Sequence, residues 1–323
     1  MIKHKFIYIK KIWLFFSVIL FMTIVLFSCS SKGKVLDIET KVITEEASIV
    51  DSNLATEIQS FKINQSWSQQ PNSCERTVFY KYPENDNNNS PVVIALHGSG
   101  GNAKEEINRY SYLDSHLIVA PQGYNGSWNI ARESSKAPDV DFINKIIIEL
   151  KTFEKIDSDQ ISIIGYSNGS ALINQLLIEL ESESFKTAVC KFSQLNTLQY
   201  REESFWSRSN IDSDDHDLQV LPTSKNRRIL SFAGTEDSTC PYYGGIGIFD
   251  YNFINAEEAA FIWAKTLGYE GDQIENPILE TENFFRFSYM DGKVIHYKLQ
   301  GAGHSFGNLI EESKLIIKKF VNN

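Results

Sequence analysis

Hydrophobic and polar residues follow two periods along this chain. From about Ile63 onward, apolar runs of strand length alternate with segments whose apolar residues recur at helical spacing. This alternation predicts an α/β fold with a mainly parallel sheet flanked by helices. The expected strands span 76–82, 91–96, 117–120, 160–164, 187–192, 228–232, 284–290 and 293–299. The expected helices span 139–153, 170–180, 256–267 and 309–320.

Polar residues at two element ends support these boundaries. Asp139 opens a helical pattern that includes Phe142, Ile146 and Leu150, and its carboxylate is a suitable N-cap. Asp291-Gly292 lies between two strand-like segments and favours the tight turn of a β-hairpin. We therefore expect a helix that starts at Asp139 and a hairpin near the end of the chain.

The N-terminal residues have the order of an export signal, basic first and apolar next. Residues 12–27 are almost wholly apolar, and Ser28 and Cys29 follow them. A cysteine directly after the cleavage point resembles the bacterial lipoprotein signal, in which that cysteine carries the lipid. Phe27 is bulkier than usual there, and the apolar run approaches spanning length, so a plain membrane anchor is the alternative. The basic residues are Lys3, Lys5, Lys10 and Lys11.

These patterns divide the chain into three segments. Residues 1–28 are expected to be the lipoprotein signal peptide, and residues 29–62, rich in Ser, Thr, Glu and Lys, a flexible tether. Residues 63–323 are expected to form one folded domain. We expect this domain to be exported and held at the bacterial cell envelope by a lipid on Cys29, with the outer membrane favoured, or to be secreted.

Composition and charge narrow the possible partners. Hydrophobic residues make up 42% of the 323 residues, which is ordinary for a globular protein with a core. The formal net charge is −10, so no nucleic-acid partner is expected, because phosphate binding needs a basic face. Besides Cys29 the chain has Cys74, Cys190 and Cys240, which allow at most one disulfide among them. Cys190 with Cys240 is one pairing, and Cys74 is an alternative partner.

Gly165-Tyr166-Ser167-Asn168-Gly169 has the G-x-S-x-G pattern of a nucleophile elbow. It follows an expected buried strand and opens an expected helix, which is the context that this motif requires. The glycines permit a tight turn that raises the Ser167 hydroxyl above the sheet. The turn also places the Asn168 amide where an oxyanion would develop. The pattern therefore predicts Ser167 as a catalytic nucleophile.

A serine nucleophile needs a base and an acid that orients the base. In α/β-hydrolases these follow the serine in the order acid, then histidine. His304 lies in a loop of small residues late in the chain, whereas His296 lies within an expected strand, which favours a structural role. Asp237 follows the expected strand 228–232 and is the predicted acid, with its neighbour Glu236 interpreted as an exposed loop residue.

The second oxyanion donor is expected at an early junction between strand and loop. His97-Gly98-Ser99-Gly100-Gly101 follows the expected strand 91–96 and fits this position. Glycines let the backbone bend so that an amide, taken to be that of Ser99, faces the carbonyl oxygen. His97 is interpreted as structural, because a base at this position would break the order of the triad.

These residues together resemble the esterases related to poly(3-hydroxybutyrate) depolymerases and to feruloyl and acetylxylan esterases, called carbohydrate esterase family one. The resemblance covers most of residues 75–323 and implies an α/β-hydrolase fold with the same triad. It also implies that Trp128 and Asn129 line the substrate cleft. Ala233 stands where the family often has histidine, and Ser170 where a small apolar residue is usual. The matching segments are 96–101, 120–129, 139–143, 165–169, 234–237, 241–242 and 303–304.

The triad predicts hydrolysis of a carboxylic ester through an acyl-enzyme, with no metal or organic cofactor. The resemblance implies acetyl or feruloyl groups on a polysaccharide as the substrate. The first alternative is depolymerisation of a polyester such as poly(3-hydroxybutyrate), and the second is a peptidase on the same fold. An alternative of another class is a non-catalytic glycan-binding lipoprotein, against which the complete triad argues.

A long polar stretch, 193–226, separates two expected strands. Loops after parallel strands face the active side of such a sheet, so this stretch is expected to form a lid or a wall of the cleft. Tyr200, Phe205 and Trp206 within it could stack on a sugar or an aromatic acyl group, or pack the stretch onto the domain. The acidic run 212–217 lacks the glycine and the distal glutamate of a calcium-binding EF-hand loop, which favours a solvated acidic loop.

Overall fold

The computed structural model describes residues 57–84, 89–223 and 226–323. The signal peptide expected over 1–28, Cys29 and the tether as far as residue 56 lie outside the described residues. The last residues of the expected tether do not belong to a tether, because strand β1 (Gln59–Trp67) starts within it. β1 pairs with β2 (Gln70–Lys81). Exposed and less exposed residues alternate along all of β1, but two of its five inward positions are the glutamines Gln59 and Gln65, which weakens the apolar signal in the sequence.

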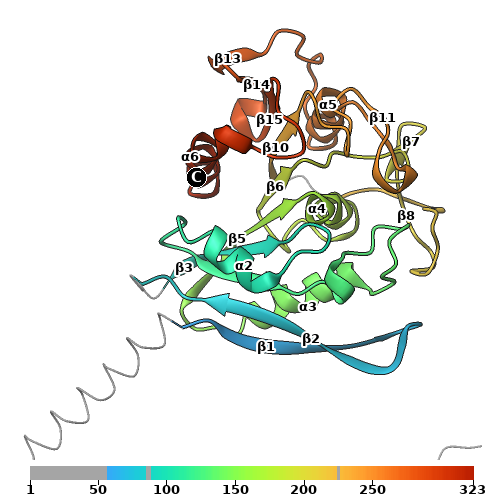
Figure 1. The fold of residues 1–323 in the computed structure, drawn as a ribbon, viewed down its shortest axis with the longest axis vertical. Helices are drawn as coiled ribbons and strands as arrows, with labels where there is room; N and C mark the ends of the chain where they lie inside the picture. Colours follow the sequence, from blue (N-terminus) through green and yellow to red (C-terminus); the bar gives the residue numbers. More distant parts are fainter. Residues whose placement is uncertain (1–56, 85–88, 224–225) are drawn as a thin grey trace, which may run out of the picture. The chain divides into compact units, whose positions relative to one another are not determined.

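Ten strands form one mixed sheet whose central strands are parallel (Figure 1). Strands β4 to β15 in the sheet order pair in parallel, while β1, β2, β14 and β13 add antiparallel pairs at the two edges. The order is β1, β2, β4 (Leu117–Pro121), β3 (Ser90–Leu96), β5 (Ile156–Tyr166), β6 (Thr187–Lys191), β10 (Arg228–Gly234), β15 (Val294–Leu299), β14 (Phe284–Tyr289) and β13 (Ile278–Thr281). The parallel α/β architecture expected from the sequence is therefore confirmed.

Helices cover both faces of the sheet because its central strands are apolar on both faces. In β3, Val92 and Ile94 belong to one hydrophobic cluster, whereas Val93 and Ala95 belong to another. The first cluster includes α3 (Asp139–Leu150), α4 (Asn168–Glu179) and α5 (Ala256–Thr266). The second includes α2 (Ala103–Arg109) and α6 (Ile310–Val321). Among the described residues, no helix has the length and apolarity needed to cross a membrane.

The start of α3 differs in detail from its expected form. The helix begins at Asp139, but Pro138 is its N-cap residue. The Asp139 carboxylate is buried and forms an ion pair of 2.6 Å with the buried guanidinium of Arg76. It also accepts the Asn129 amide at 2.6 Å. Asp139 therefore ties β2 and the loop after β4 to α3, and a partner that is distant in sequence decides its role.

The expected hairpin is confirmed at the end of the chain, where β14 and β15 are antiparallel neighbours. The turn between them, η3 (Met290–Gly292), has positive φ at Asp291 and Gly292, a conformation that this dipeptide favours. Helix α2 is absent from the sequence-based expectation. Asn102 caps it by accepting the Lys104 amide at 2.9 Å, and Glu105 and Glu106 follow in the first turn. This order of residues is a signal from which α2 could have been predicted.

The stretch 193–226 folds into a small sheet of its own. This sheet contains β7 (Tyr200–Arg201), β8 (Ser204–Ser207) and β9 (Leu218–Val220). Phe205 is buried and stacks on Trp263 of α5 with ring centroids 4.8 Å apart, and the Tyr200 ring lies 4.9 Å from that of Phe205. The aromatic residues of this stretch therefore pack it onto the domain, which is one of the two interpretations that the sequence allows.

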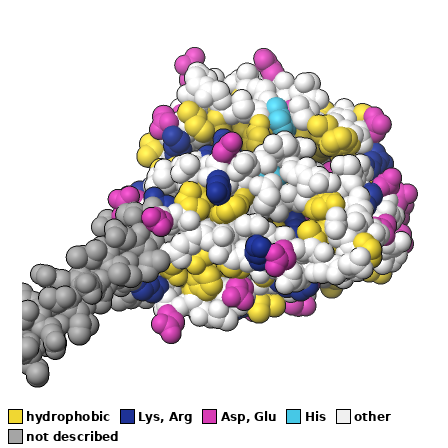
Figure 2. All heavy atoms as spheres, turned by 60° about the horizontal axis from the view of Figure 1, so that its bottom comes forward, with side chains coloured by type: hydrophobic (Ala, Val, Ile, Leu, Met, Phe, Trp, Pro, Cys, Tyr) yellow, Lys and Arg dark blue, Asp and Glu magenta, His cyan; other side chains and the backbone are white. Residues whose placement is uncertain are grey.

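Two short elements complete the region that follows β10. Strands β11 (Gly245–Ile246) and β12 (Asn252–Phe253) pair with each other, and the turn η2 (Ile248–Asp250) connects them. The surface carries charges of both signs. On the face shown in Figure 2, lysine and arginine side chains are scattered and do not form a continuous basic stripe.

Candidate active site

Ser167 occupies a strained turn between β5 and α4. Its backbone angles, φ 52° and ψ −117°, lie in a region that residues with side chains rarely adopt. A Cβ on Gly165 would lie 2.5 Å from the backbone of Gly169, and a Cβ on Gly169 would lie 2.5 Å from the carbonyl oxygen of Leu96. The two glycines of the motif are thus required by backbone contacts, as the elbow interpretation demands.

Three side chains from different strand ends meet at this turn. The Ser167 hydroxyl lies 2.8 Å from His304 Nε2, and His304 Nδ1 lies 2.7 Å from Asp237 Oδ2. The His304 side chain is 22% exposed, whereas that of Asp237 is fully buried. With Nδ1–H donating to the carboxylate, Nε2 is free to accept the serine proton. The structure therefore brings together Ser167, His304 and Asp237 in the geometry of a catalytic triad.

The loop after β10 fixes the Asp237 carboxylate. Asp237 Oδ1 accepts the backbone amides of Thr239 at 2.8 Å and Cys240 at 2.9 Å, which leaves Oδ2 for the histidine. Glu236, the neighbouring acid, is exposed, as expected. These two amide bonds hold the carboxylate in one orientation.

The loop that carries His304 is attached to the loop of Asp237 by close backbone packing. A Cβ on Gly234 would lie 2.2 Å from the carbonyl oxygen of Ala302, so only glycine fits there. The Glu236 amide donates to that same oxygen at 2.9 Å. On the other side, the Tyr166 hydroxyl donates to the His304 carbonyl at 2.7 Å. The histidine is therefore positioned from both the acid loop and the elbow.

Ser99 and Asn168, the expected oxyanion donors, border the same small recess as Ser167. Asn168 is the first residue of α4, where backbone amides have no partner within the helix. His97 supports the Ser99 loop from behind: its Nε2 accepts the Gly123 amide at 3.0 Å, so its Nδ1 donates to the Gly98 carbonyl at 2.7 Å. Burial lowers the pKa of His97, which agrees with the structural role expected for it.

His296, the other late histidine, lies buried within β15. Its Nδ1 contacts the Ser231 hydroxyl at 2.9 Å, and its Nε2 contacts the Tyr242 hydroxyl at 3.3 Å. Burial lowers the pKa of His296 to about 3. A histidine that stays neutral and satisfied inside the domain matches the structural role expected from its position in a strand.

Trp128 and Asn129 do not line a cleft, and this expectation was wrong. Trp128 is fully buried, and its indole Nε1–H donates to the His97 carbonyl at 2.8 Å. Asn129 is 1% exposed, and its side chain donates to the Ala137 carbonyl and accepts from Arg208. These polar atoms of Trp128 and Asn129 bond to other protein groups and not to a ligand space. Both residues therefore hold the loop after β4 against the elbow.

Glu133 belongs to the site, although no motif in the sequence marks it. Its buried carboxylate accepts the Ile130 and Ala131 amides at 2.9 Å each, the Tyr251 hydroxyl at 3.1 Å and the Asn168 side-chain amide at 3.3 Å. Burial raises the pKa of Glu133, and these hydrogen bonds oppose that effect. The carboxylate thus links the elbow to two other loops and borders the recess beside Ser167.

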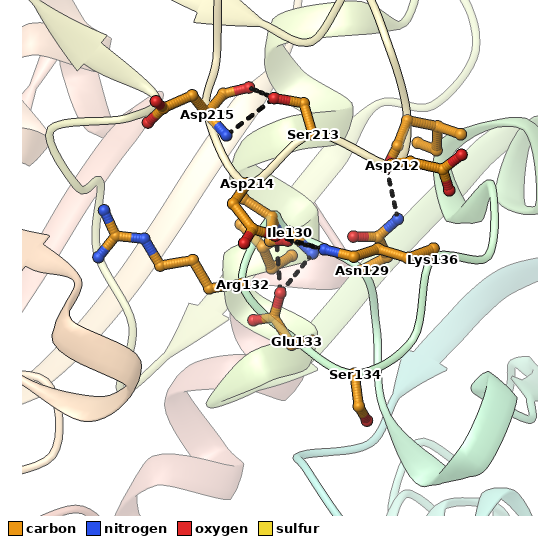
Figure 3. A network of polar contacts seen from close by, with 12 residues as sticks. Asn129, Ile130, Arg132, Glu133, Ser134, Lys136, Asp212, Ser213, Asp214 and Asp215 are labelled. Atoms are coloured by element: carbon orange, nitrogen blue, oxygen red, sulfur yellow. Dashed lines mark hydrogen bonds and ion pairs between the residues drawn. The ribbon is translucent and has the colours of Figure 1, made fainter.

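Figure 3 shows that the loop containing Glu133 lies beside the acidic run 212–217 and contacts it. Lys136 forms an ion pair of 2.6 Å with Asp214, and the Asn129 side chain donates to the Ile211 carbonyl at 3.3 Å. Within the described residues, no group of three or more His, Cys, Asp or Glu side chains is placed to hold a metal ion. Cys74, Cys190 and Cys240 are free thiols.

The chain is similar in sequence to two proteins named as esterases. No protein-family model matches the chain. NocK of Nocardia uniformis subsp. tsuyamanensis, a protein named as an esterase, is 30% identical over 100 residues, which are 28% of this chain and 29% of that protein. Feruloyl esterase B of Piromyces equi is 21% identical over 248 residues, 72% of this chain and 43% of that protein. The chain therefore spans less than half the length of each relative.

The solved structure of the acetyl xylan esterase from Aspergillus awamori is similar to this one, with a TM-score of 0.54. The two are 15% identical, and the match covers 79% of this chain and 98% of that one. The likeness in fold, the order of the parallel strands and the serine turn between β5 and α4 agree with one another. The described domain has the α/β-hydrolase fold.

Proposed function

We propose that this chain is a serine esterase that hydrolyses carboxylic esters through an acyl-enzyme. The observation that carries the proposal is the continuous line of hydrogen bonds from Ser167 through His304 to Asp237, at 2.8 Å and 2.7 Å. The sequence relatives named as esterases support the same reaction class.

In the proposed mechanism, Ser167 Oγ attacks the ester carbonyl while His304 Nε2 takes the serine proton. Asp237 stabilises the imidazolium that forms and keeps it oriented. The amides of Ser99 and Asn168 donate to the oxyanion of the tetrahedral intermediate. His304 then gives the proton to the leaving alcohol, and in a second step it activates water to cleave the acyl-enzyme.

The test is hydrolysis of p-nitrophenyl acetate by the full chain and by the Ser167→Ala variant. The substitution is expected to lower kcat/KM by about 10⁴-fold or more, because the nucleophile is lost. A fluorophosphonate probe is expected to label the wild-type chain and not the variant. Ester hydrolysis that survives the substitution at an undiminished rate would exclude Ser167 as the nucleophile.

We further propose that the substrate is an acyl group carried by a polysaccharide. This proposal is supported by the names of two similar proteins, a feruloyl esterase and an acetyl xylan esterase. A panel of acetylated xylan, methyl ferulate and poly(3-hydroxybutyrate) tests it. Release of either acetate or ferulate would support the proposal, whereas activity on the polyester alone would favour a depolymerase.

We also propose that the chain is exported and lipidated on Cys29, as the order of basic, apolar and small residues at its start suggests. Expression in a bacterium with a radiolabelled fatty acid tests this proposal. Label in the wild-type chain and its loss in Cys29→Ala are the expected results. Label that remains after the substitution would show that Cys29 is not the modified residue.

A further inference from the structure

A small recess opens beside the nucleophile. It encloses about 30 Å³ and is bordered by Ser99, Ser167 and Asn168, the residues of the elbow and the expected oxyanion site. Its remaining wall is mainly apolar and includes Ala171 of α4 and Phe253 of β12. Neither His304 nor Asp237 borders it.

The position of the recess decides which half of an ester would occupy it. The leaving alcohol must receive a proton from His304 Nε2, so the alcohol lies on the histidine side of Ser167. The carbonyl oxygen must face the amides of Ser99 and Asn168. The acyl chain is the one substituent left on the carbonyl carbon, and the recess, which Ser167 borders and His304 does not, is the space open to it.

The size of the recess limits the acyl group. The 30 Å³ open to water-sized groups is small beside the roughly 300 Å³ or more of pockets that bury drug-sized ligands. The methyl group of an acetyl ester fits this volume, and a propionyl chain fills it. The aromatic ring of a feruloyl group does not fit. On the basis of the proposed esterase activity, we infer that this enzyme is specific for acyl groups of two or three carbons.

The outer wall of the recess identifies the residues that set this limit. Ile248 and Phe249 of η2 border the recess while remaining 41% and 46% exposed, so they form its rim at the protein surface. Phe249 has φ 54°, a conformation that is unfavourable for a bulky residue and is maintained by its surroundings.

Two contacts hold the turn η2 in place. Arg132 Nη1 donates to the Asp250 carbonyl at 2.7 Å, and the Tyr251 hydroxyl donates to the Glu133 carboxylate at 3.1 Å. These contacts hold the backbone of η2, and with it Phe249, beside the recess, and Ala171 of α4 forms another part of the lining. We assign the limit on acyl length to Phe249. The small side chain of Ala171 determines how much volume the recess offers.

The experiment measures kcat/KM for p-nitrophenyl acetate, butyrate and octanoate with the full chain. The wild type is expected to prefer acetate to butyrate by about tenfold or more, since a misfit of one or two methylenes costs at least this factor. Phe249→Ala is expected to raise the ratio of butyrate to acetate about tenfold. Ala171→Val is expected to lower the rate on acetate, because the added methyl groups fill the recess.

Tyr243→Ala is the matched control, because Tyr243 is an exposed aromatic residue of the same loop that does not border the recess. Its ratio of butyrate to acetate is expected to equal that of the wild type. Similar rates on all three esters, or an unchanged ratio in Phe249→Ala, would overturn the inference while leaving the esterase proposal intact. Failure of the wild type to hydrolyse any ester, with no fluorophosphonate labelling of Ser167, would overturn both.

Discussion

The loops of the triad and the segment 127–133 both follow the carboxyl ends of parallel strands. The polar atoms of the two regions nevertheless have different kinds of partner. His304 keeps 22% of its side chain exposed, and its Nε2 is directed at the nucleophile. Trp128, Asn129 and Glu133 are buried, and their polar atoms bond to other parts of the protein. A motif thus identifies residues of the active-site region. Their burial decides whether they contact the substrate or support the residues that contact it.

The strongest test of this contrast is Asp237→Asn. The variant can still accept the Thr239 and Cys240 amides, but it no longer stabilises the imidazolium, so kcat is expected to fall by about 10⁴-fold. Steady-state hydrolysis of p-nitrophenyl acetate measures the change. Glu236→Gln alters the exposed neighbour and is expected to leave kcat unchanged. A loss below about tenfold in Asp237→Asn would remove Asp237 from the triad.

Glu133→Gln tests the supporting segment. The amide group cannot accept all the donors that the carboxylate accepts, so the free energy of unfolding is expected to fall by about 2–3 kcal/mol. We expect kcat to fall by about tenfold as the elbow loses its support. Urea denaturation and kinetics measure the two effects, with the exposed Glu149→Gln as the control. A loss of activity with no loss of stability would instead give Glu133 a direct role in catalysis.

The buried histidine His296 makes the stability of the domain depend on pH. The pKa of His296 is about 3 in the folded protein and near 6.5 in the unfolded chain, so the unfolded chain binds more protons between these values. The stabilisation by neutral His296 is therefore complete above about pH 6.5 and declines as the pH falls toward 3. At pH 5 the expected loss is about 2 kcal/mol relative to neutral pH.

Urea denaturation at pH 7 and pH 5 measures this loss. In His296→Gln, the difference between the free energies of unfolding at the two pH values is expected to be smaller by the same amount. An undiminished pH dependence in that variant would assign the effect to other groups. His116 and His216, with pKa values lowered to about 4 by burial, contribute in the same direction in both proteins.

The smallest effect on activity is expected for Trp128→Phe. The substitution removes the hydrogen bond from Nε1 to the His97 carbonyl, and the free energy of unfolding should fall by about 1 kcal/mol or somewhat more. KM for acetylated xylan should stay within about twofold, because a buried ring does not touch the substrate. A strongly raised KM with unchanged stability would restore Trp128 to the substrate cleft.

The sequence by itself determined the elements whose signals are local. Runs such as 91–96 and 117–120 are apolar on both faces and therefore form buried strands of the sheet. Gly165 and Gly169 flank Ser167 because a Cβ at either position would clash with the backbone. Five consecutive residues of the sequence are enough to show this requirement. The α/β-hydrolase order of nucleophile, acid and histidine then pointed to Asp237 and His304 as the partners of Ser167.

The tertiary structure alone decided which residues face a substrate. Glu133 meets Tyr251 across 118 positions of the chain, and Ile248 and Phe249 close a recess that begins at Ser99. Strand β1 is identified by its pairing with β2. Trp128 can be buried because His97 and Asn168 accept hydrogen bonds from its two N–H groups. Such contacts depend on which distant segments pack together, and neither periodicity nor a short motif contains that information.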